Sequence, residues 1–356
     1  MIVNNKPYRT IWYSEENECV QIIDQRFLPF KFVIESIESV DKMAIAITEM
    51  HLRGAGLIGA AAAWGLFLAV NESNDWDFIL KSASKLAKTR PTAVNLKAAL
   101  DKMLDVLENS EENNRLYLAK KTAQIISDAD AESCRRIGEN GLAIIEEIHN
   151  RKKGDVVNIL THCNAGWLAF VDYGSALSPV YLALEKGIPV HVYVDETRPR
   201  NQGARLTAWE LAQQGVPHTI IADNVGGHLM QNGMVDMVIV GADRVSKNGD
   251  VANKIGTYLK ALAAKDNDIP FYVAFPSTTF DAKIKNGIRD IPIEQRSGDE
   301  VLFMEGLNNE GKEVKVRIAP NESQAVNYGF DVTPARLVSG YITENGVFAD
   351  ADLIKG

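Results

Sequence analysis

The sequence contains few cysteines. Only Cys19, Cys134 and Cys163 occur among 356 residues. An odd and small number of cysteines in a long chain excludes a disulfide framework and favours a reducing compartment. The first seven residues also lack the basic segment and the apolar run of a signal peptide. We therefore expect a cytoplasmic protein.

Positive charge is also scarce. The chain has 38 Lys and Arg against 47 Asp and Glu, and its formal net charge is −9. Nucleic-acid backbones and anionic lipids attract proteins with an excess of Lys and Arg, so we expect neither partner. The longest apolar run, from Leu57 to Val70, is shorter than the ~18 residues that indicate a membrane span. Because this run is rich in Ala and Gly, it predicts a helix buried inside the protein.

Common cofactor motifs are missing from the β-rich part of the chain. Its first predicted strand, which ends at Leu160, is not followed by GxGxxG, and the chain contains no GxxxxGK[ST]. These absences argue against a dinucleotide and a P-loop nucleotide. His162 precedes Cys163, but no CxxC and no second His or Cys stands at ligand spacing. We expect no cofactor and no metal.

The N-terminal third is predicted to be mostly helical after a short hairpin. The segments 10–13 and 19–23 alternate around a polar turn, which indicates the hairpin. From Ser36 to about Ile125, apolar residues recur at three- and four-residue spacing, as in amphipathic helices. Pro91 stands where the first turn of a helix is expected. A further long helix is predicted over Leu116–His149.

From Gly154 onward, short apolar runs alternate with helical stretches. Strands that are apolar throughout are typical of a parallel sheet covered on both faces. We predict an α/β protein with a mostly helical N-terminal domain (1–125) and a Rossmann-like parallel-sheet domain (126–356), connected by a helix. The predicted strands are Val156–Leu160, Pro189–Val194, His218–Ala222, Asp236–Val240 and Phe271–Phe275.

Polar residues follow each predicted strand. In open parallel sheets, ligands bind beyond the carboxyl ends of the strands, so these residues predict a site at one edge of the sheet. The residues are His162, Cys163, Asn164, Asp195, Glu196, Arg198, Asp223, Asn224, Asp243, Arg244 and Ser277 to Thr279.

Two of these residues are candidates for chemistry. Cys163 precedes a helix predicted to begin near Gly166, and a helix N-terminus stabilises a thiolate; the alternative is a small buried residue. Asp243 is a candidate general acid or base if burial raises its pKa; the alternative is an ion pair with Arg244 or a cap for the next turn. His162 is expected to point to the opposite face from Cys163.

Several segments are candidate anion sites. Asn253 and Lys254 are predicted to open a helix, where a Lys is unfavourable unless an anion is held there; the alternative is a solvated surface Lys. The segment 53–56, Arg-Gly-Ala-Gly, precedes the predicted buried helix and is a second candidate phosphate site. Arg90 adds a cation at a helix start, and Gln202 lies either in a substrate loop or in an ordinary helical turn.

Several long motifs are distributed over nearly the whole chain. They are RGAGLIGAAAAWG (53–65), TRPTAVNL (89–96), THCNAG (161–166), DETRPRNQGARLTAWEL (195–211), GADRVSKNGDVANKIGTY (241–258), IPFYVAFPSTTFD (269–281) and FDVTPARLV (330–338). Together they resemble the methylthioribose-1-phosphate isomerase family, within the superfamily that includes the regulatory subunits of eukaryotic initiation factor two B.

The resemblance implies a homodimer that isomerises an aldose 1-phosphate to a ketose 1-phosphate in methionine salvage, with 5-methylthioribose 1-phosphate as substrate. It implies that Cys163 and Asp243 are the catalytic pair. The implied substrate-binding residues are Arg53, Gly54, Ala55, Arg90, Gln202, Asn253 and Lys254. A member of the superfamily that only binds other proteins would need neither Cys163 nor Asp243.

The chain departs from the family pattern at two places. Gly56-Leu57 replaces the usual Pro-Ala, and Val225-Gly226-Gly227 replaces the usual Met-Ala-Ala. Either the changes alter the pocket for the 5-substituent, which would suit 5-deoxyribose 1-phosphate, or they leave specificity unchanged. The sequence also leaves two routes open for moving hydrogen from C2 to C1. In one, a Cys163 thiolate takes a proton; in the other, a hydride shifts directly and Cys163 stabilises the transition state.

Overall fold

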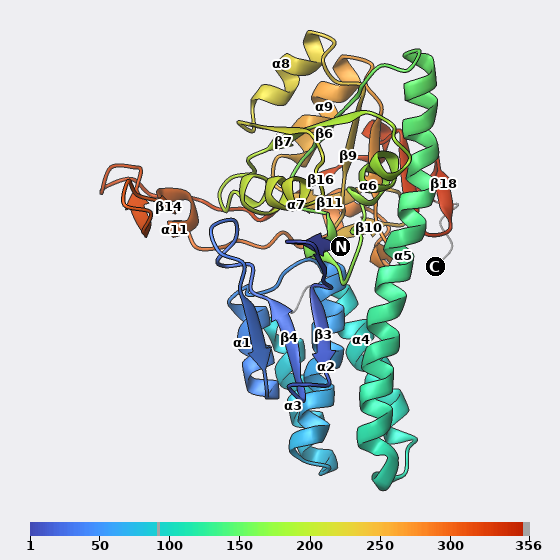
Figure 1. Cartoon of the computed structure of the whole chain (residues 1–356), viewed down its shortest axis with the longest axis vertical. Coiled ribbons are helices and arrows are strands. Elements are labelled where there is room, and N and C mark those ends of the chain that lie inside the picture. Colours follow the sequence, from blue (N-terminus) through green and yellow to red (C-terminus); the bar gives the residue numbers. More distant parts are fainter. Residues whose placement is uncertain (91–92, 352–356) are drawn as a thin grey trace.

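The computed structural model describes residues 1–90 and 93–351. A mostly helical N-terminal part lies at the bottom of the view in Figure 1, a part built on a parallel sheet lies above it, and the long helix α5 runs beside both. The predicted α/β fold, with a helical N-terminal part and a Rossmann-like sheet, is confirmed.

The predicted N-terminal hairpin is confirmed. Its two strands pair antiparallel, and a third strand extends the small sheet. Ile11 and Ile22 face each other across the hairpin, and both are fully buried in the core of the helical part. The strands are β3 (Ile11–Ser14), β4 (Cys19–Ile23) and β5 (Ile34–Ile37), preceded by the ribbon of β1 (Ile2–Val3) and β2 (Lys6–Pro7).

Helices fill most of the segment predicted to be helical. Side chains cap two of them: Ser39 Oγ accepts from the Lys42 N–H, and the Asp75 carboxylate accepts from the Phe78 N–H. Such caps satisfy N–H groups that have no partner within the helix. Pro91, expected in a first helical turn, lies outside the described residues. The helices are α1 (Val40–Thr48), α2 (Ala55–Glu72), α3 (Trp76–Thr89) and α4 (Val94–Glu108).

Helix α2 forms the centre of the helical part. Its 18 residues have a mean hydropathy of 1.4, which is enough for a membrane span by length and composition, but 83% of this window is buried inside the protein. Small residues allow neighbouring helices to approach closely: a Cβ on Gly65 would lie 2.9 Å from Met43 Cγ of α1. The prediction of a helix buried inside the protein is therefore confirmed.

Helix α5 (Arg115–Arg151) passes through residue 126, the predicted domain boundary, without interruption. Its first half contributes Ala123 to the core of the helical part, and its second half contributes Ile145 to the core of the sheet part. Because one continuous helix belongs to both cores, the division at residue 126 stays a prediction.

The five predicted strands pair in one parallel sheet. From β6 the chain moves outward to β7 and β8, and it then returns to β9 on the other side of β6, so the strand order reverses between β6 and β9. In sheet order the strands are β8 (His218–Ile221), β7 (Val190–Asp195), β6 (Val157–Thr161), β9 (Met237–Val240), β12 (Phe271–Ala274), β17 (Gly340–Thr343) and the antiparallel edge strand β18 (Gly346–Phe348). The accompanying helices are α6 (Ser178–Glu185), α7 (Ala208–Gln213), α8 (Val225–Gln231) and α9 (Thr257–Asp266).

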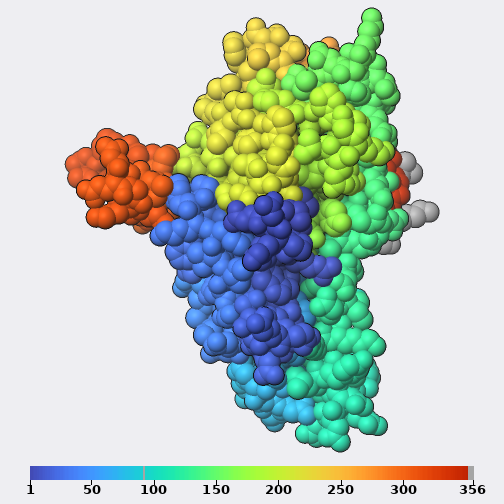
Figure 2. All heavy atoms as spheres, viewed as in Figure 1, coloured from blue at the N-terminus to red at the C-terminus, as the bar shows by residue number. Residues whose placement is uncertain are grey.

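Smaller sheets lie outside the parallel sheet. Besides the N-terminal sheet and ribbon, these are a sheet with the order β13-β10-β11-β16 and the hairpin β14-β15. The hairpin projects from the body of the molecule (Figure 2). Their strands are β10 (Arg244–Ser246), β11 (Val251–Lys254), β13 (Phe280–Asp281), β14 (Phe303–Leu307), β15 (Glu313–Arg317) and β16 (Phe330–Thr333). The short helices α10 (Gly287–Asp290) and α11 (Asp299–Leu302) precede the hairpin.

The contact between α5 and α6 generates a stability prediction. A Cβ on Gly138 would overlap Ser178 Oγ, whereas a Cβ on Gly227 in α8 would lie 3.7 Å from Ala263 Cβ, an ordinary contact. We expect Gly138→Ala to lower the free energy of unfolding by about 1–3 kcal/mol, because the packed helices must move apart. Gly227→Ala should raise it by about 0.5–1 kcal/mol through its better helix propensity. Denaturant unfolding measures both, and a stabilised Gly138→Ala variant would contradict the packing.

Candidate active site

The predicted site residues line one cavity. It has a volume of about 70 Å³ and lies where the carboxyl ends of β6 and β9 meet the start of α2. Since β6 and β9 flank the reversal of strand order, this is the place where parallel α/β sheets bind ligands. The predicted residues in its lining are Arg53, Gly54, Ala55, Arg90, Cys163, Gln202, Asp243, Asn253 and Lys254.

Three of the five strand ends reach this cavity. Strand β6 leads to Cys163, β9 leads to Asp243, and the loop after β7 carries Gln202. Asp223, after β8, instead accepts hydrogen bonds from backbone N–H groups of the loop after β7, at 2.7 and 2.8 Å. Ser277, after β12, donates its hydroxyl to Glu344 at 2.5 Å. The expectation that all five ends form the site is therefore wrong for β8 and β12.

Cys163 is held by its backbone. Its φ angle is +67°, in the left-handed region, which turns the chain sharply at the end of β6. Its N–H donates to Thr197 Oγ1 at 2.8 Å, and its carbonyl accepts from Thr207 Oγ1 at 2.7 Å. The Cys163 thiol donates to Gln202 Oε1 at 3.2 Å. These bonds hold the sulfur at the cavity wall.

The prediction that a helix begins near Gly166 is wrong. A single 3₁₀ turn, Trp167–Ala169, follows there, and the next α-helix begins at Ser178. A helix dipole therefore does not explain a thiolate at Cys163. Burial raises the pKa of the Cys163 thiol, and the nearby positive charges of Lys254 and Arg53 only partly oppose this effect. The raised pKa favours the thiol form, which can donate the hydrogen bond to Gln202.

His162 turns away from the cavity, as predicted. Its Nδ1 lies 2.7 Å from Asp195 Oδ2, and its Nε2 donates to the Ile255 carbonyl at 2.8 Å. Lys260 Nζ lies 3.2 Å from the same Asp195 oxygen. This buried cluster connects the ends of β6 and β7 to the start of α9, and so supports the cavity from behind.

Asp243 faces the cations of the cavity. Although the residue is exposed to solvent, desolvation by the surrounding protein raises the pKa of Asp243. The positive charges of Lys254, Arg90 and Arg53 act in the opposite direction. Arg244, the alternative partner suggested by the sequence, has its Nη1 3.7 Å from Asp281. A carboxyl with a raised pKa is suited to donate a proton near neutral pH.

Asn253 and Lys254 lie on strand β11, so the prediction that they open a helix is wrong. Helix α9 begins three residues later, after Gly256, whose φ is +102°. Lys254 Nζ lies 5.1 Å from the centroid of the Phe330 ring, a cation–π distance. Asn253 donates to Thr257 Oγ1 at 3.0 Å. Lys254 is thus a fixed cation of the cavity wall, and the helix start does not create its site.

Two arginines complete the positive wall. Arg53 is 6% exposed; its Nη1 donates to the Asn164 carbonyl at 3.0 Å and its Nη2 donates to Asn164 Oδ1. Within the described part of the chain, its Nε is buried and has no hydrogen-bond partner. Arg90 lies at the end of α3, and not at the helix start expected from the sequence; its Nη2 is 3.7 Å from Glu294. Both arginines line the cavity.

The backbone of Ala169 lies close to Gly54, at the start of α2, and leaves no room for a side chain there. Gly54 has a φ of +105°, and a Cβ there would overlap the backbone of Ala169. Gly54, Gly56 and Gly59 spell GxGxxG, but they open α2 after a bend and not after a strand of the parallel sheet, so the dinucleotide-binding context is missing.

The two departures from the family pattern lie outside the cavity lining. A Cβ on Gly56 would overlap Asp130 Oδ1 and Phe170, and only Phe170 belongs to the lining. Gly226 lies on α8, where a Cβ would be 2.9 Å from Leu160 Cδ1 and 3.4 Å from Lys260. Both glycines therefore make room for neighbouring side chains, and neither one shapes the wall of the cavity directly.

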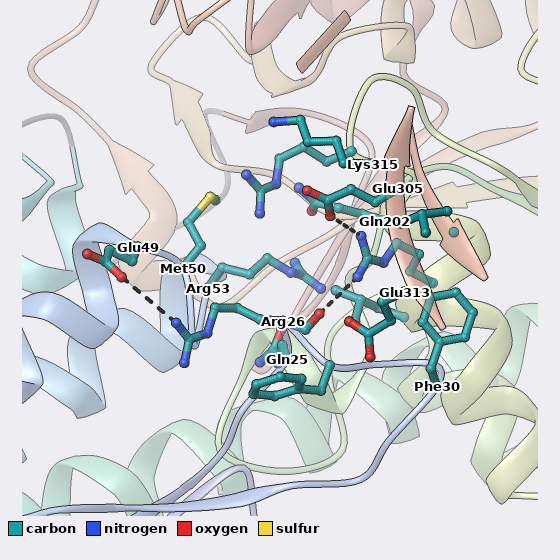
Figure 3. A pocket seen from close by; sticks show the side chains of 16 residues that line it. Gln25, Arg26, Phe30, Glu49, Met50, Arg53, Gln202, Glu305, Glu313 and Lys315 are labelled. Carbon is teal, nitrogen blue, oxygen red and sulfur yellow. Dashed lines mark hydrogen bonds and ion pairs between the residues drawn. The ribbon is translucent and has the colours of Figure 1, made fainter. Parts of the chain in front are cut away.

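A larger outer cavity of about 500 Å³ shares Met50, Arg53 and Gln202 with the inner one. Figure 3 shows Arg53 extending from the side of Met50 toward Gln202, with Glu305 and Lys315 of the projecting hairpin also in the lining. The Arg53 side chain thus stands at the boundary between the two spaces.

Among the described residues, two clusters combine His and acid ligand atoms within 4.8 Å of one another. One consists of Asp24, Glu35 and His51, and the other of His162, Asp195 and Asp223. In each cluster a cation already bonds to an acid. Arg26 Nη2 donates to Asp24 at 2.7 Å, and Lys260 lies against Asp195. These bonds neutralise carboxylates that a metal would need, and the expectation of no metal stays a prediction.

Sequence reasoning missed several residues of the site. Asn164 was noted only as a strand-end residue, yet it binds Arg53. Glu210, on α7, is wholly buried behind Asn164 and accepts a hydrogen bond from its amide. Met50 and Phe330 contribute apolar walls. A buried acid in an amphipathic helix and isolated apolar residues carry no local signal in the sequence.

The fold and the cavity define a class of α/β proteins in which a small anion would fit between a Rossmann-like sheet and a helical cap. The chain belongs to the Initiation factor 2 subunit family, whose model matches residues 51–350.

Within this family, the chain is similar to methylthioribose-1-phosphate isomerases and to an initiation-factor subunit. A methylthioribose-1-phosphate isomerase from Desulfatibacillum aliphaticivorans is 56% identical over 353 residues, which is 98% of this chain and 95% of that protein. The crystal structure of 5-methylthioribose 1-phosphate isomerase from Pyrococcus horikoshii aligns with a TM-score of 0.83 at 40% identity, over 96% of this chain and 92% of that chain. The structure of translation initiation factor eIF-2B, subunit delta, from A. fulgidus aligns with a TM-score of 0.80 at 38% identity, over 96% of each chain.

The electrostatics of the cavity generate a prediction for Cys163. The Lys254 charge lowers the pKa of the thiol, so Lys254→Met should raise this pKa further and leave less thiolate. We expect iodoacetamide at about pH 8 to alkylate Cys163 several-fold more slowly in this variant, because the thiolate is the reacting form. Peptide mass spectrometry follows the modified residue. The exposed Lys247→Met is the matched control and should react like the unmodified protein. An unchanged or faster rate in Lys254→Met would contradict the assigned electrostatics.

Proposed function

We propose that the protein isomerises 5-methylthioribose 1-phosphate to 5-methylthioribulose 1-phosphate, an aldose-to-ketose step of methionine salvage. The observation that carries this proposal is that a thiol, Cys163, and an acid with a raised pKa, Asp243, line the same small cavity as Arg53, Arg90 and Lys254. The names of relatives at 53–56% identity over nearly the whole chain support it.

The cations hold the phosphate in this proposal. Arg53 and Lys254 line the cavity, and Arg90 lines it from the end of α3. Guanidinium and ammonium groups make charge-assisted hydrogen bonds with phosphate oxygens. The helix N-terminus of α2, which begins at Ala55 in the lining, adds free N–H groups.

Asp243 acts as the general acid. The phosphate ester at C1 prevents the sugar from opening to a free aldehyde, so the bond between C1 and the ring oxygen must break with the phosphate in place. A proton from Asp243 to the ring oxygen makes this oxygen a better leaving group. The electron pair of the breaking bond stays on the oxygen, and C1 becomes an oxocarbenium-like centre.

Hydrogen then moves from C2 to C1. We propose a direct hydride shift, because the Cys163 thiol donates to Gln202 and has a raised pKa, whereas a base must first be deprotonated. The hydride brings its electron pair to C1, and the C2 hydroxyl becomes a ketone by releasing a proton, which balances the proton that Asp243 supplied. Cys163 packs against the reacting carbons and excludes water from the cationic transition state.

Two alternatives differ in substrate and in class. The 5-deoxyribose 1-phosphate alternative depended on the replacements Gly56-Leu57 and Val225-Gly226-Gly227, and all of these residues lie outside the cavity lining. Their location favours an unchanged specificity for the methylthio sugar. A protein that only binds other proteins, as its 38% identity to an initiation-factor subunit would allow, has no use for the arrangement of Cys163 and Asp243 in one cavity.

We also propose that the protein works in the cytoplasm as a homodimer. The cytoplasmic location is supported by three cysteines that are all free and buried. The homodimer is supported by the family resemblance, and light scattering coupled to size-exclusion chromatography measures it.

Turnover of the sugar phosphate tests the proposed function. We expect the purified protein to form the ketose from 5-methylthioribose 1-phosphate faster than from 5-deoxyribose 1-phosphate. Cys163→Ala and Asp243→Asn should each lower kcat by at least about 10²-fold, the usual range for a lost acid or base, while circular dichroism shows an intact fold. Cys19→Ala and Asp130→Asn, outside the cavity, are the matched controls and should stay active. No turnover of either sugar, or a near-normal rate in a cavity variant, would contradict the proposal or that residue's role.

The hydrogen route is tested separately with substrate carrying deuterium at C2. A direct shift keeps the label, so we expect it at C1 of the ketose formed in ordinary water, as read by NMR. Loss of the label to solvent would show the proton route, with Cys163 as the base.

A further inference from the structure

A chain of buried polar groups runs from Arg53 into the protein interior. Arg53 donates to the carbonyl and to the side-chain Oδ1 of Asn164, and Asn164 Nδ2 donates in turn to Glu210 Oε1. The three side chains come from the segment before α2, the turn after β6 and helix α7. Arg53 is 6% exposed, Asn164 5% and Glu210 0%. The chain therefore connects a cation of the cavity to an acid that solvent does not reach.

The hydrogen bonds fix the orientation of the Asn164 amide. Thr207 has a single hydroxyl proton, which it donates to the Cys163 carbonyl at 2.7 Å, so its oxygen accepts from Asn164 Nδ2 at 3.0 Å. Both N–H groups of the Asn164 amide are then occupied, one by Thr207 and one by Glu210. The amide oxygen is left to face Arg53. A rotated amide would place donors against the donors of the guanidinium.

Glu210 has a location that needs an explanation. A carboxyl group buried without an ion pair is costly, and among the described residues no Lys or Arg lies within ion-pair distance of Glu210. Burial raises the pKa of Glu210 to about 7, while the Asn164 bond and the Arg53 charge lower it. Gly166 makes the position available, because a Cβ there would overlap the Glu210 carboxyl.

Asn164 separates the Glu210 carboxyl from the Arg53 guanidinium, and this separation has a consequence for ligand binding. A carboxylate in direct contact would occupy the guanidinium fork and compete with an anionic ligand. With the amide between them, Glu210 does not contact the guanidinium, and Arg53 stays in the lining of the cavity. Among the described residues, Asn164 holds the guanidinium and no carboxylate lies within ion-pair distance of it.

We propose that Glu210 is a positioning residue that acts through the Asn164 amide to hold the Arg53 guanidinium in the wall of the cavity, where it binds the phosphate of the substrate. This inference rests on the proposed function, because it takes the ligand of Arg53 to be a sugar phosphate. Glu210 itself does not line the cavity and touches neither the ligand nor the reacting atoms.

Glu210→Met and Glu210→Gln test this role. The Met variant keeps the length and volume of the side chain but removes the acceptor, so the Asn164 amide loses its fixed orientation. We expect KM to rise at least tenfold while kcat changes less than about threefold, since a hydrogen bond to a charged group is involved. The Gln variant keeps an acceptor oxygen and should return KM to within about threefold of the unmodified protein.

The matched control is Asp130→Asn. Asp130 also has a pKa raised by burial to about 7, but it accepts from the Val171 N–H and lies outside both the cavity lining and the Arg53 chain. Its KM and kcat should stay near those of the unmodified protein.

A double-mutant comparison identifies the route of the effect. Asn164→Ala removes the middle of the chain, so Glu210→Met should raise KM no further in that background, because coupled residues are not additive. Three results would each overturn the proposal. The KM increases of Asn164→Ala and Glu210→Met could multiply in the double variant, KM could stay unchanged in a folded Glu210→Met variant, or KM could rise equally in the Met and Gln variants.

If the unmodified protein turns over neither sugar phosphate, the proposed function fails on that result alone. The same variants are then compared by titration calorimetry with inorganic phosphate. Weaker phosphate binding in Glu210→Met, restored in Glu210→Gln, would still support the role of Glu210 toward Arg53, and equal binding in all variants would reject it.

Discussion

The bond between Arg53 and Asn164 connects the two halves of the molecule at the place where the chemistry is proposed. Arg53 belongs to the segment that opens α2 in the helical part, and Asn164 follows the central strand β6 of the sheet. A guanidinium that is 6% exposed needs partners, and the turn after β6 supplies them. The position of Cys163 depends on the same turn, because its left-handed backbone directs the sulfur and the next residue to different walls of the cavity.

The cavity has a local charge that differs from that of the whole protein. The chain carries a formal charge of −9, yet Arg53, Arg90 and Lys254 converge on one small space. Asp243 and Cys163 lie among these cations, and burial still raises the pKa of both groups. Desolvation therefore favours the protonated forms of the acid and the thiol, against the opposing effect of the positive charges. This combination is suited to binding a phosphate and to donating a proton within a few ångströms of it.

Some features of the site were predictable and others were not. The strand ends at Cys163 and Asp243 were visible because a parallel sheet always presents its carboxyl ends at one edge. The α-helix expected near Gly166 and the helix expected at Lys254 were wrong, because a single 3₁₀ turn and an additional strand occupy those places. Local periodicity does not reveal which strands pair with β11. Its partners are β10, which precedes it directly, and β16, which lies far along the chain. The resemblance supplied the roles of residues that composition alone left open.

The sequence by itself determined the α/β class, the alternation of strands and helices, and the buried character of α2, because these follow from local patterns of apolar residues. The long motifs determined the family. Only the tertiary structure decided that Asp223 and Ser277 stay out of the cavity, that Gly56 makes room for Asp130, and that Glu210 lies behind Arg53. These facts depend on contacts between segments far apart in the chain. The physical reason is that burial and hydrogen bonding depend on distances in space, and the separation of two residues along the sequence does not give their distance in the folded protein.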